Sequence, residues 1–387
     1  MPQAEPTTRT MNSTLSRAAI PFFNYRGAFA AREDEFLEII RGVIRRGAFI
    51  QQQDLADFED ALASFLGVPF AIGVGNATDG LIFALKAAGL QAGDEVIFPS
   101  HTMVASAAAI AHAGGVPVPV DCGWDHLVDP ASIAAAVTGR TRAIMPVQLN
   151  GRTCDMDAIE QIARENELMI VEDAAQALGS KFKGRPAGTF GVAAAFSFYP
   201  AKILGCFGDG GAVVTSDTEV ARKVRLLRDH GRNEEGEVET WGFNSRLDNM
   251  QAAILHAQFK DYGEIISRRR SIAKLYDSLL SGIPEVTLPP GPDANSDHFD
   301  VYQNYEIEAE RRDELRAYLA ENGVGTIIQW GGTPVHRMKA LGFDVTLPAT
   351  ERLFDRCLML PLNMTITDDD IGYIADVIRG FYSGDAA

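Results

Sequence analysis

Hydrophobic residues recur at helical spacing in several stretches of the chain. Leu55, Phe58, Leu62 and Phe65 follow one another at intervals of three and four, which predicts an amphipathic helix over 54–65. The same criterion predicts helices over 32–46, 81–88, 104–113, 156–165, 265–280 and 311–322.

Short apolar runs lie between the earlier helices. They predict strands over 70–74, 95–98, 116–120, 143–146, 169–171, 193–198 and 212–214. Short apolar strands that alternate with helices are typical of a mostly parallel sheet covered by helices on both faces. Ligands of such folds lie beyond the carboxyl ends of the strands. The residues that follow these ends are therefore candidates for a site: Thr78, Met103, Asp173, Gln176, Ser197 and Lys202.

The pattern changes beyond residue 257, where longer amphipathic segments alternate with predicted strands over 305–307 and 325–328. This mixture indicates a smaller α+β domain. We predict a flexible N-terminal tail over 1–16, a large domain over 17–257 and a small C-terminal domain over 258–387. The stretch DNMQAAILHAQFK is expected to form one helix that continues from the large domain.

Composition and charge exclude several classes of function. The 387 residues include 35 basic and 52 acidic ones, and the net charge of −17 opposes binding to nucleic acid or to an anionic membrane surface. The one basic run, 268–270, falls in a helical pattern and is expected to be a solvated face. No stretch reaches the roughly 20 apolar residues of a transmembrane helix, and no signal peptide is indicated.

Cysteine usage points to a reducing compartment. Cys122, Cys154, Cys206 and Cys357 are widely separated and show no CxxC spacing, so neither a zinc site nor a disulfide framework is expected. The sequence predicts a cytoplasmic protein without a metal.

Lys202 is the only cation in the run AAFSFYPAKILGCFGDGGAVVT, between an apolar strand and a glycine-rich turn. Largely apolar surroundings push a lysine toward its neutral form, and a neutral amine can hold a carbonyl compound as a Schiff base. The alternative is a surface lysine in a loop.

Three further positions complete a possible cofactor site. The turn GNATDG between a strand and a helix exposes backbone N–H groups that can bind a phosphate, although Thr78 or Asp79 could instead simply cap the helix. Asp173 follows the strand MIVED, where it could cap a helix or bind the protonated ring nitrogen of a pyridine cofactor. The Ser197 hydroxyl could donate to a phosphate. Together with Lys202, this set meets the needs of pyridoxal phosphate.

These residues resemble the nucleotide-sugar aminotransferase family, the DegT-like branch of fold-type I pyridoxal-phosphate enzymes. The resemblance extends over nearly the whole chain through GNATDG, GDEVIFPSHT, QLNGRTCDMD, VEDAAQALGS, AGTFGVAAAFSFYPAK, GDGGAVVT, RDHGR and GFNSRLDNMQAAIL. It implies that Lys202 forms the Schiff base and moves protons at the reacting carbon. It also implies that Asp173 pairs with the pyridine nitrogen.

The resemblance implies further roles around the cofactor. Gln176 contacts the side of the ring that carries the phenolic oxygen. Ser197, the Ala77–Thr78 backbone and the Thr78 side chain hold the phosphate. Asn244 reaches the phosphate from the neighbouring subunit, which makes the site a property of a homodimer.

Two places depart from the family pattern. Met103 stands where the family commonly has an aromatic residue stacked on the cofactor, so a thioether is expected to take over that contact. The alternative is that Met103 is a core residue of the helix that follows. The C-terminal segment IIQWGGTPVHRMKALGF matches more loosely, and Trp330 and His336 are the expected sugar-side residues. Family members in which histidine replaces the lysine are dehydratases, and Lys202 argues against that activity.

The resemblance implies a homodimeric aminotransferase that moves an amino group from an amino acid, expected to be L-glutamate, to a keto group of a nucleotide-linked sugar. An alternative substrate is a keto-cyclitol of aminoglycoside assembly. A different class of function, a regulatory protein that binds pyridoxal phosphate without turnover, is the remaining alternative.

Overall fold

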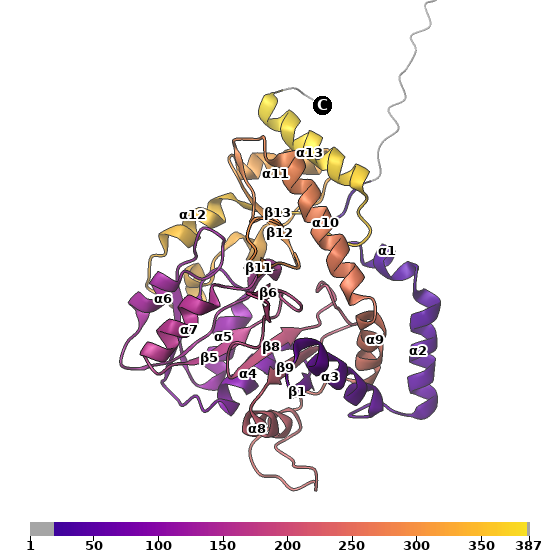
Figure 1. Ribbon diagram of the computed structural model, residues 1–387, viewed down its shortest axis with the longest axis vertical. Coiled ribbons are helices and arrows are strands. Elements are labelled where there is room, and N and C mark those ends of the chain that lie inside the picture. Colours follow the sequence, from indigo (N-terminus) through magenta and orange to yellow (C-terminus); the bar gives the residue numbers. More distant parts are fainter. Residues whose placement is uncertain (1–18, 385–387) are drawn as a thin grey trace, which may run out of the picture.

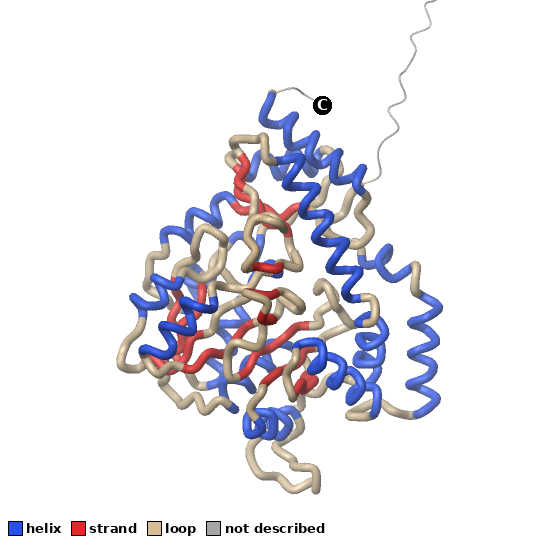
Figure 2. The backbone as a smooth tube through the Cα atoms, in the orientation of Figure 1, coloured by secondary structure: helices blue, strands red, loops and turns tan. Residues whose placement is uncertain are grey.

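A seven-stranded sheet forms the centre of the larger part of the molecule in the computed structural model, which describes residues 19–384 (Figures 1 and 2). The tail predicted over 1–16 lies outside the described residues. Across the sheet the order is β1 (Phe70–Val74), β9 (Gly211–Thr215), β8 (Ala193–Ser197), β5 (Met169–Asp173), β4 (Thr141–Ile144), β2 (Glu95–Pro99) and β3 (Val116–Val120).

The sheet is mostly parallel, as predicted. β9 pairs antiparallel with β1 and with β8, and the other neighbours pair parallel. Hydrophobicity does not reveal this single reversal, because both faces of every central strand are buried whichever way the strand runs.

Helices cover both faces of the large sheet (Figure 1). On one face lie α4 (Ala77–Ala87), α5 (Val104–Ala113) and α8 (Thr218–Arg228). On the other lie α3 (Gln53–Leu66), α6 (Pro130–Ala136), α7 (Met156–Glu165) and α9 (Asn249–Phe259). Successive strand residues alternate between the two sides: Val96 and Phe98 pack toward α4 and α5, whereas Ile97 packs toward α6 and α7. The predicted α/β architecture is confirmed.

The C-terminal part is built on a smaller antiparallel sheet of β10 (Val286–Thr287), β12 (Tyr305–Ala309) and β13 (Cys357–Leu360). Its helices are α10 (Tyr262–Leu280), α11 (Arg312–Glu321), α12 (Pro348–Arg356) and α13 (Asp368–Ser383). The strand predicted over 325–328 is wrong. Only Ile327 pairs there, in an isolated bridge to Met359, because the chain turns into the 3₁₀ segment η2 (Gln329–Gly332).

Three shorter features connect these parts. The N-terminal helices α1 (Tyr25–Ala30) and α2 (Glu33–Arg46) extend along one side, where α2 packs against α9 (Figure 1). A third sheet joins β6 (Lys181–Phe182) and β7 (Arg185–Pro186) to β11 (His298–Phe299). Ile20 packs in the core of the C-terminal part although it falls within the predicted large domain. The domain boundary at 257 stays a prediction; α9 ends at Phe259, and α10 begins at Tyr262.

The basic run 268–270 is not the solvated face that the sequence suggests. Arg269 is 6% exposed and donates hydrogen bonds to the carbonyl oxygens of Tyr302 (2.8 Å) and Gln303 (2.8 Å). Arg270 donates to the carbonyl oxygens of Asp300 and Pro292. A guanidinium can satisfy buried carbonyl groups with its fork of donors, so these arginines fix the loop before β12 against α10.

Within residues 19–384, none of the helices combines the length and the apolar composition needed to cross a membrane.

Candidate active site

A cavity of about 600 Å³ lies beyond the carboxyl ends of β5 and β8 and is closed from the other side by the segment around η2. Most of the residues expected from the sequence line this one cavity: Ala77, Thr78, Met103, Asp173, Gln176, Ser197, Lys202 and Trp330. Residues separated by more than 200 positions in the chain therefore meet where a parallel sheet places its ligands.

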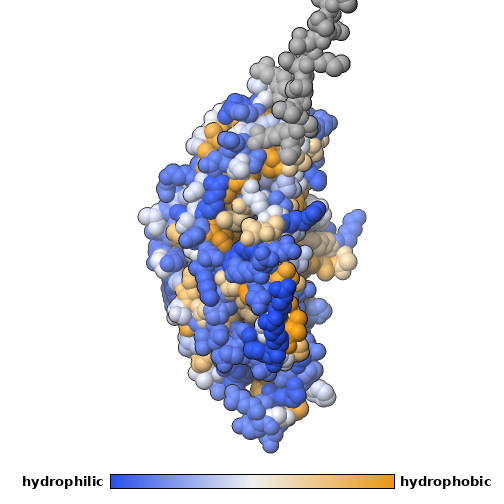
Figure 3. Space-filling model, turned by 90° about the vertical axis from the view of Figure 1, so that its right-hand side faces the viewer, coloured by the Kyte–Doolittle hydropathy of each residue, from blue (hydrophilic) through white to orange (hydrophobic). Residues whose placement is uncertain are grey.

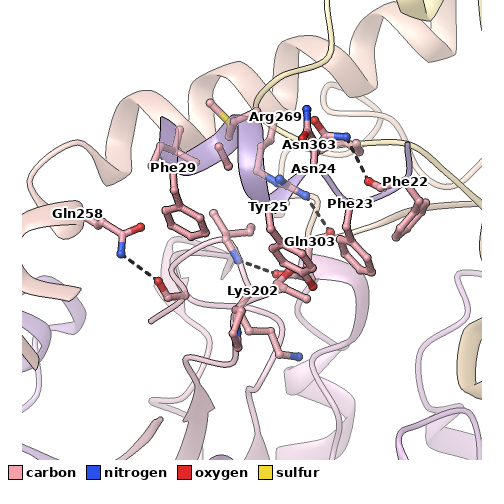
Figure 4. A pocket seen from close by; sticks show the side chains of 18 of the residues that line it. Phe22, Phe23, Asn24, Tyr25, Phe29, Lys202, Gln258, Arg269, Gln303 and Asn363 are labelled. Carbon is pink, nitrogen blue, oxygen red and sulfur yellow. Dashed lines mark hydrogen bonds between the residues drawn. The ribbon is translucent and has the colours of Figure 1, made fainter. Parts of the chain in front are cut away.

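Lys202 is held by contacts on both sides of its backbone. Its N–H donates to the Tyr199 carbonyl oxygen (2.8 Å). The Gln303 amide donates to the Ala201 carbonyl oxygen (2.9 Å) and accepts from the Ile203 N–H (3.0 Å). Figure 4 shows Lys202 next to Gln303, below the N-terminal segment that carries Phe23 and Tyr25.

Burial lowers the pKa of Lys202 to about 8, although the charge of Asp173 acts in the opposite direction. A substantial fraction of the amine is therefore neutral and nucleophilic near neutral pH. The position of Lys202 in a cavity wall disagrees with the alternative of a surface lysine.

Asp173 ends β5 and is 5% exposed. Its Oδ2 accepts a hydrogen bond from the Ser106 hydroxyl (2.7 Å), and its Oδ1 accepts one from the Ala175 N–H (3.2 Å). Burial raises the pKa of Asp173, while Ser106, Ala175 and the charge of Lys202 oppose the rise. The element that follows β5 is the strand β6, so the carboxylate caps a turn and not a helix. Its remaining acceptor capacity faces a cavity in which a cationic N–H group would offset the desolvation.

The first turn of α4 forms the end of the cavity suited to an anion. Asn76 is the N-cap and accepts from the Asp79 N–H (2.9 Å), so the alternative in which Thr78 or Asp79 caps this helix is wrong. The N–H groups of Ala77 and Thr78 lie in the first turn, where a helix has no internal acceptor for them. These donors, the positive end of the helix dipole and the hydroxyl of Ser197 together suit a phosphate.

An amide cluster that the sequence reasoning missed surrounds Gln176. The Gln176 Oε1 accepts from the Asn150 N–H (2.8 Å) and from the Asn304 side chain (3.4 Å). Asn304 and Gln329 also line the cavity. Gln329 directly precedes Trp330 in the sequence, and that adjacency is the only signal that could have pointed to it.

Met103 and Trp330 lie where the sequence placed them, at the cavity. The Met103 side chain is 47% exposed and its sulfur accepts from the Ala105 N–H (3.1 Å), which disagrees with the alternative of a core residue. Trp330 has a positive φ of 52°, an unusual conformation for a bulky residue, and its buried indole N–H has no acceptor within 19–384.

His336 is not brought to the cavity, contrary to the expectation for a sugar-side residue. It is 3% exposed, with Nδ1 2.6 Å from the Ser100 hydroxyl and Nε2 3.1 Å from the Glu351 carboxylate. These contacts fix the C-terminal segment to the end of β2. The sequence match is loose here, and spacing alone does not show that this histidine points into the protein.

Asn244 also lies outside the cavity of its own chain. It is exposed in the loop between α8 and α9, which extends away from the body of the molecule below α8 (Figure 1). The next residue, Ser245, accepts from the Gly75 N–H (3.0 Å) and donates to the Asp79 carboxylate (2.7 Å). This placement is compatible with a residue that serves a neighbouring subunit.

The residues of the cavity fit pyridoxal phosphate. Lys202 offers an amine for a Schiff base, Asp173 a buried carboxylate for the ring nitrogen, and the start of α4 donors for the phosphate. The described part of the chain holds no group of histidine, cysteine, aspartate and glutamate side chains that could bind a metal ion.

Comparison with known proteins agrees with this fit. Residues 31–379 match the model of the DegT/DnrJ/EryC1/StrS aminotransferase family. The dTDP-3-amino-3,4,6-trideoxy-alpha-D-glucose transaminase of Streptomyces venezuelae is 39% identical over 95% of this chain and 98% of that protein. The UDP-N-acetyl-3-dehydro-alpha-D-glucosamine 3-aminotransferase of Acidithiobacillus ferrooxidans is 37% identical over 93% of this chain and 97% of that protein.

A solved structure extends the similarity to the fold. The crystal structure of S. venezuelae DesV in complex with a ketimine intermediate superposes with a TM-score of 0.90 at 38% identity, covering 94% of this chain and 99% of that one. At this coverage the match includes both the large sheet and the C-terminal part. The chain belongs to the DegT/DnrJ/EryC1/StrS aminotransferase family of pyridoxal-phosphate enzymes.

Proposed function

We propose that the protein transfers an amino group from L-glutamate to a keto group of a nucleotide-linked sugar, with pyridoxal phosphate held in the cavity described above. The observation that carries the proposal is the Lys202 amine, with its lowered pKa, in the same cavity as the Asp173 carboxylate and the first turn of α4. Relatives that match almost the whole chain are named as transaminases of dTDP- and UDP-linked sugars.

Each residue has a defined task in this proposal. Lys202 holds the cofactor and moves a proton at the reacting carbon of the substrate. Asp173 keeps the ring nitrogen protonated, and the bound cofactor then supplies an electron sink. The remaining contacts are divided among the phosphate (the Ala77 and Thr78 N–H groups with the Ser197 hydroxyl), the side of the phenolic oxygen (Gln176) and the ring face (the Met103 thioether). Trp330 faces the sugar and offers its N–H as a donor.

We further propose a homodimer in which Asn244 completes the partner's phosphate site. The loop that carries Asn244 exposes apolar residues: Trp241 is 95% exposed and Val238 69% exposed. On the side of the molecule that α2 occupies, Leu37 and Ile44 are 40% and 55% exposed, and hydrophobic side chains interrupt the mainly hydrophilic surface in Figure 3. Burial of such residues against a second copy would remove apolar area from water.

A cytoplasmic location is also part of the proposal. It is supported by the four cysteines, which are all buried and free.

The proposal is tested by incubating the holoenzyme with L-glutamate and a small set of dTDP- and UDP-linked keto-sugars, with Lys202→Ala as the inactive control. We expect formation of an amino sugar and 2-oxoglutarate in equal amounts, and loss of both with the variant. Turnover of a keto-cyclitol in place of every nucleotide sugar would correct the substrate class. Cofactor binding without a glutamate half-reaction would instead support the regulatory alternative and refute the enzymatic one.

A further inference from the structure

Gln329 presents a buried hydrogen-bond acceptor that the protein itself does not use. The side chain is 2% exposed and lines the cavity. Its Nε2 donates to the Asn150 Oδ1 (2.7 Å), but no donor within the described chain reaches its Oε1. A buried acceptor that has lost water and gained no partner is costly, and most such groups in proteins are paired. This oxygen therefore requires a donor from whatever fills the cavity.

The direction in which this amide points follows from its neighbour. The Asn150 Nδ2 lies 3.0 Å from the Glu306 Oε2, and an ionised carboxylate can only accept. Asn150 must therefore turn its Nδ2 toward Glu306 and its Oδ1 away. That Oδ1 accepts from Gln329 and also from the Asn304 Nδ2 (2.9 Å). Because Gln329 must offer its NH₂ group to Asn150, its oxygen is the end left free.

Glu306 is well placed to impose this order. It is 1% exposed, with Oε2 3.0 Å from the His126 Nδ1 and 3.6 Å from the His101 Nε2. Burial works against ionisation, yet the two histidines hold the pKa of Glu306 well below its usual range. The carboxylate stays an acceptor, so the orientation passes from Glu306 through Asn150 to Gln329.

The cofactor does not supply the donor that Gln329 needs. Its one N–H group is assigned to Asp173, and its phosphate and phenolic oxygen act as acceptors. The carboxylate groups of an amino-acid donor are acceptors too, and would face another acceptor in the Gln329 oxygen. A sugar ring carries hydroxyl groups, and each can donate. Gln329 also adjoins Trp330, the residue proposed above for the sugar side.

We propose that the Oε1 of Gln329 accepts a hydrogen bond from a ring hydroxyl of the sugar substrate, in an orientation set by Asn150 and Glu306. The inference rests on the proposed function, since it assigns a specificity residue to the same site. It makes the enzyme select a nucleotide keto-sugar that keeps one particular hydroxyl.

The test compares the wild-type holoenzyme with Gln329→Met, which keeps the length of the side chain and removes the amide. Nucleotide keto-sugars that lack one hydroxyl each are assayed beside the fully hydroxylated substrate. On the full substrate we expect KM to rise about tenfold in the variant with kcat changed less than about twofold, the size expected for one neutral hydrogen bond. One deoxy substrate should lose about tenfold in kcat/KM with the wild type and almost nothing with the variant, which is the signature of a direct contact.

Two controls separate a substrate contact from a structural role. The glutamate half-reaction, the melting temperature and the cofactor absorbance should be unchanged in Gln329→Met. Gln161→Met, on the exposed face of α7, should match the wild type throughout. If Gln329→Met is destabilised, Gln329→Asn replaces it, since the shorter side chain keeps an amide but cannot serve both Asn150 and the substrate.

The outcomes distinguish this inference from the proposed function. Wild-type turnover with equal losses for every deoxy substrate in both proteins would overturn the hydrogen bond and leave the aminotransferase intact. A slower glutamate half-reaction in Gln329→Met would show that the residue faces the amino donor, which also overturns the inference. Absence of wild-type turnover on all nucleotide keto-sugars would refute the proposed function and the inference with it.

Discussion

Replacement of Asp173 by asparagine removes one negative charge from the cavity and changes little else. The amide oxygen introduced by Asp173→Asn can still accept from the Ala175 N–H, and the new NH₂ group then faces the Ser106 hydroxyl. Ser106 can accept that donor and turn its own hydrogen toward the Thr102 hydroxyl, 2.8 Å away. Because every polar group keeps a partner, we expect the free energy of unfolding to change by less than about 1 kcal/mol.

The effect on catalysis should be much larger than the effect on folding. The cofactor's ring nitrogen loses the counter-ion that keeps it protonated, so the electron sink is weakened in the transition state. We expect kcat/KM to fall about a hundredfold, which corresponds to about 2.7 kcal/mol of transition-state stabilisation. The assay is steady-state transamination with glutamate, with cofactor content measured by absorbance on the same samples.

The neighbouring carboxylate supplies a matched control. Glu172 is fully buried in the same strand and accepts from the N–H groups of Phe190 (2.6 Å) and Gly188 (2.8 Å) and from the Gln148 amide (2.8 Å). In Glu172→Gln an NH₂ group must face other donors, so stability should drop by about 1–3 kcal/mol while the folded enzyme keeps its kcat. Unchanged turnover in Asp173→Asn, or a shared loss of stability in both variants, would refute the role of Asp173 and leave it a cap of the turn.

Three further predictions address Lys202, Asn244 and Met103. Burial lowers the pKa of Lys202 to about 8 from an unfolded value near 10.5, so in the cofactor-free protein the unfolded state binds more protons between these values. The free energy of unfolding should therefore rise as pH increases from about 8 to 10.5, and urea titrations should show that Lys202→Met loses this particular rise; an identical pH dependence would contradict the lowered pKa. Co-expression of Lys202→Ala with Asn244→Asp should restore part of the activity through mixed dimers that hold one intact site, whereas mixed dimers without activity would count against a shared site. Met103→Ala should weaken cofactor retention while Met103→Phe changes it by less than about tenfold, because sulfur and ring contacts have similar energies; an equal drop in the melting temperatures of cofactor-free and cofactor-bound Met103→Ala would point to a packing role.

The sequence by itself was sufficient for the α/β architecture and for the centre of the site. Strand β1 over 70–74 and helix α5 over 104–113 have the predicted bounds, because hydrophobic periodicity is a local property of each segment. Lys202 and Asp173 could be singled out because each comes at or shortly after the end of an apolar strand, and the ends of parallel strands meet at one edge of the sheet.

Features that depend on how distant segments pack were not available from the sequence. Arg269 has the helical, charged surroundings of a surface residue, yet the loop before β12 covers it and takes its hydrogen bonds. His336 carries a side chain suited to substrate binding, but contacts with Ser100 and Glu351 turn it into the protein. In both cases the partners come from other segments of the chain, so no local pattern records the contact.

The amide cluster at the cavity illustrates the same limit at the site itself. Asn150 comes from the large domain, Glu306 from β12 and Gln329 from η2, and their order of donors and acceptors exists only once the C-terminal part has packed on the sheet. A periodic hydrophobic pattern specifies which face of an element is buried, whereas the pairing of single polar groups depends on distances of about 3 Å set by the whole fold. The sequence by itself therefore determined the chemistry at Lys202 and Asp173, and the tertiary structure decided which side chains face the substrate.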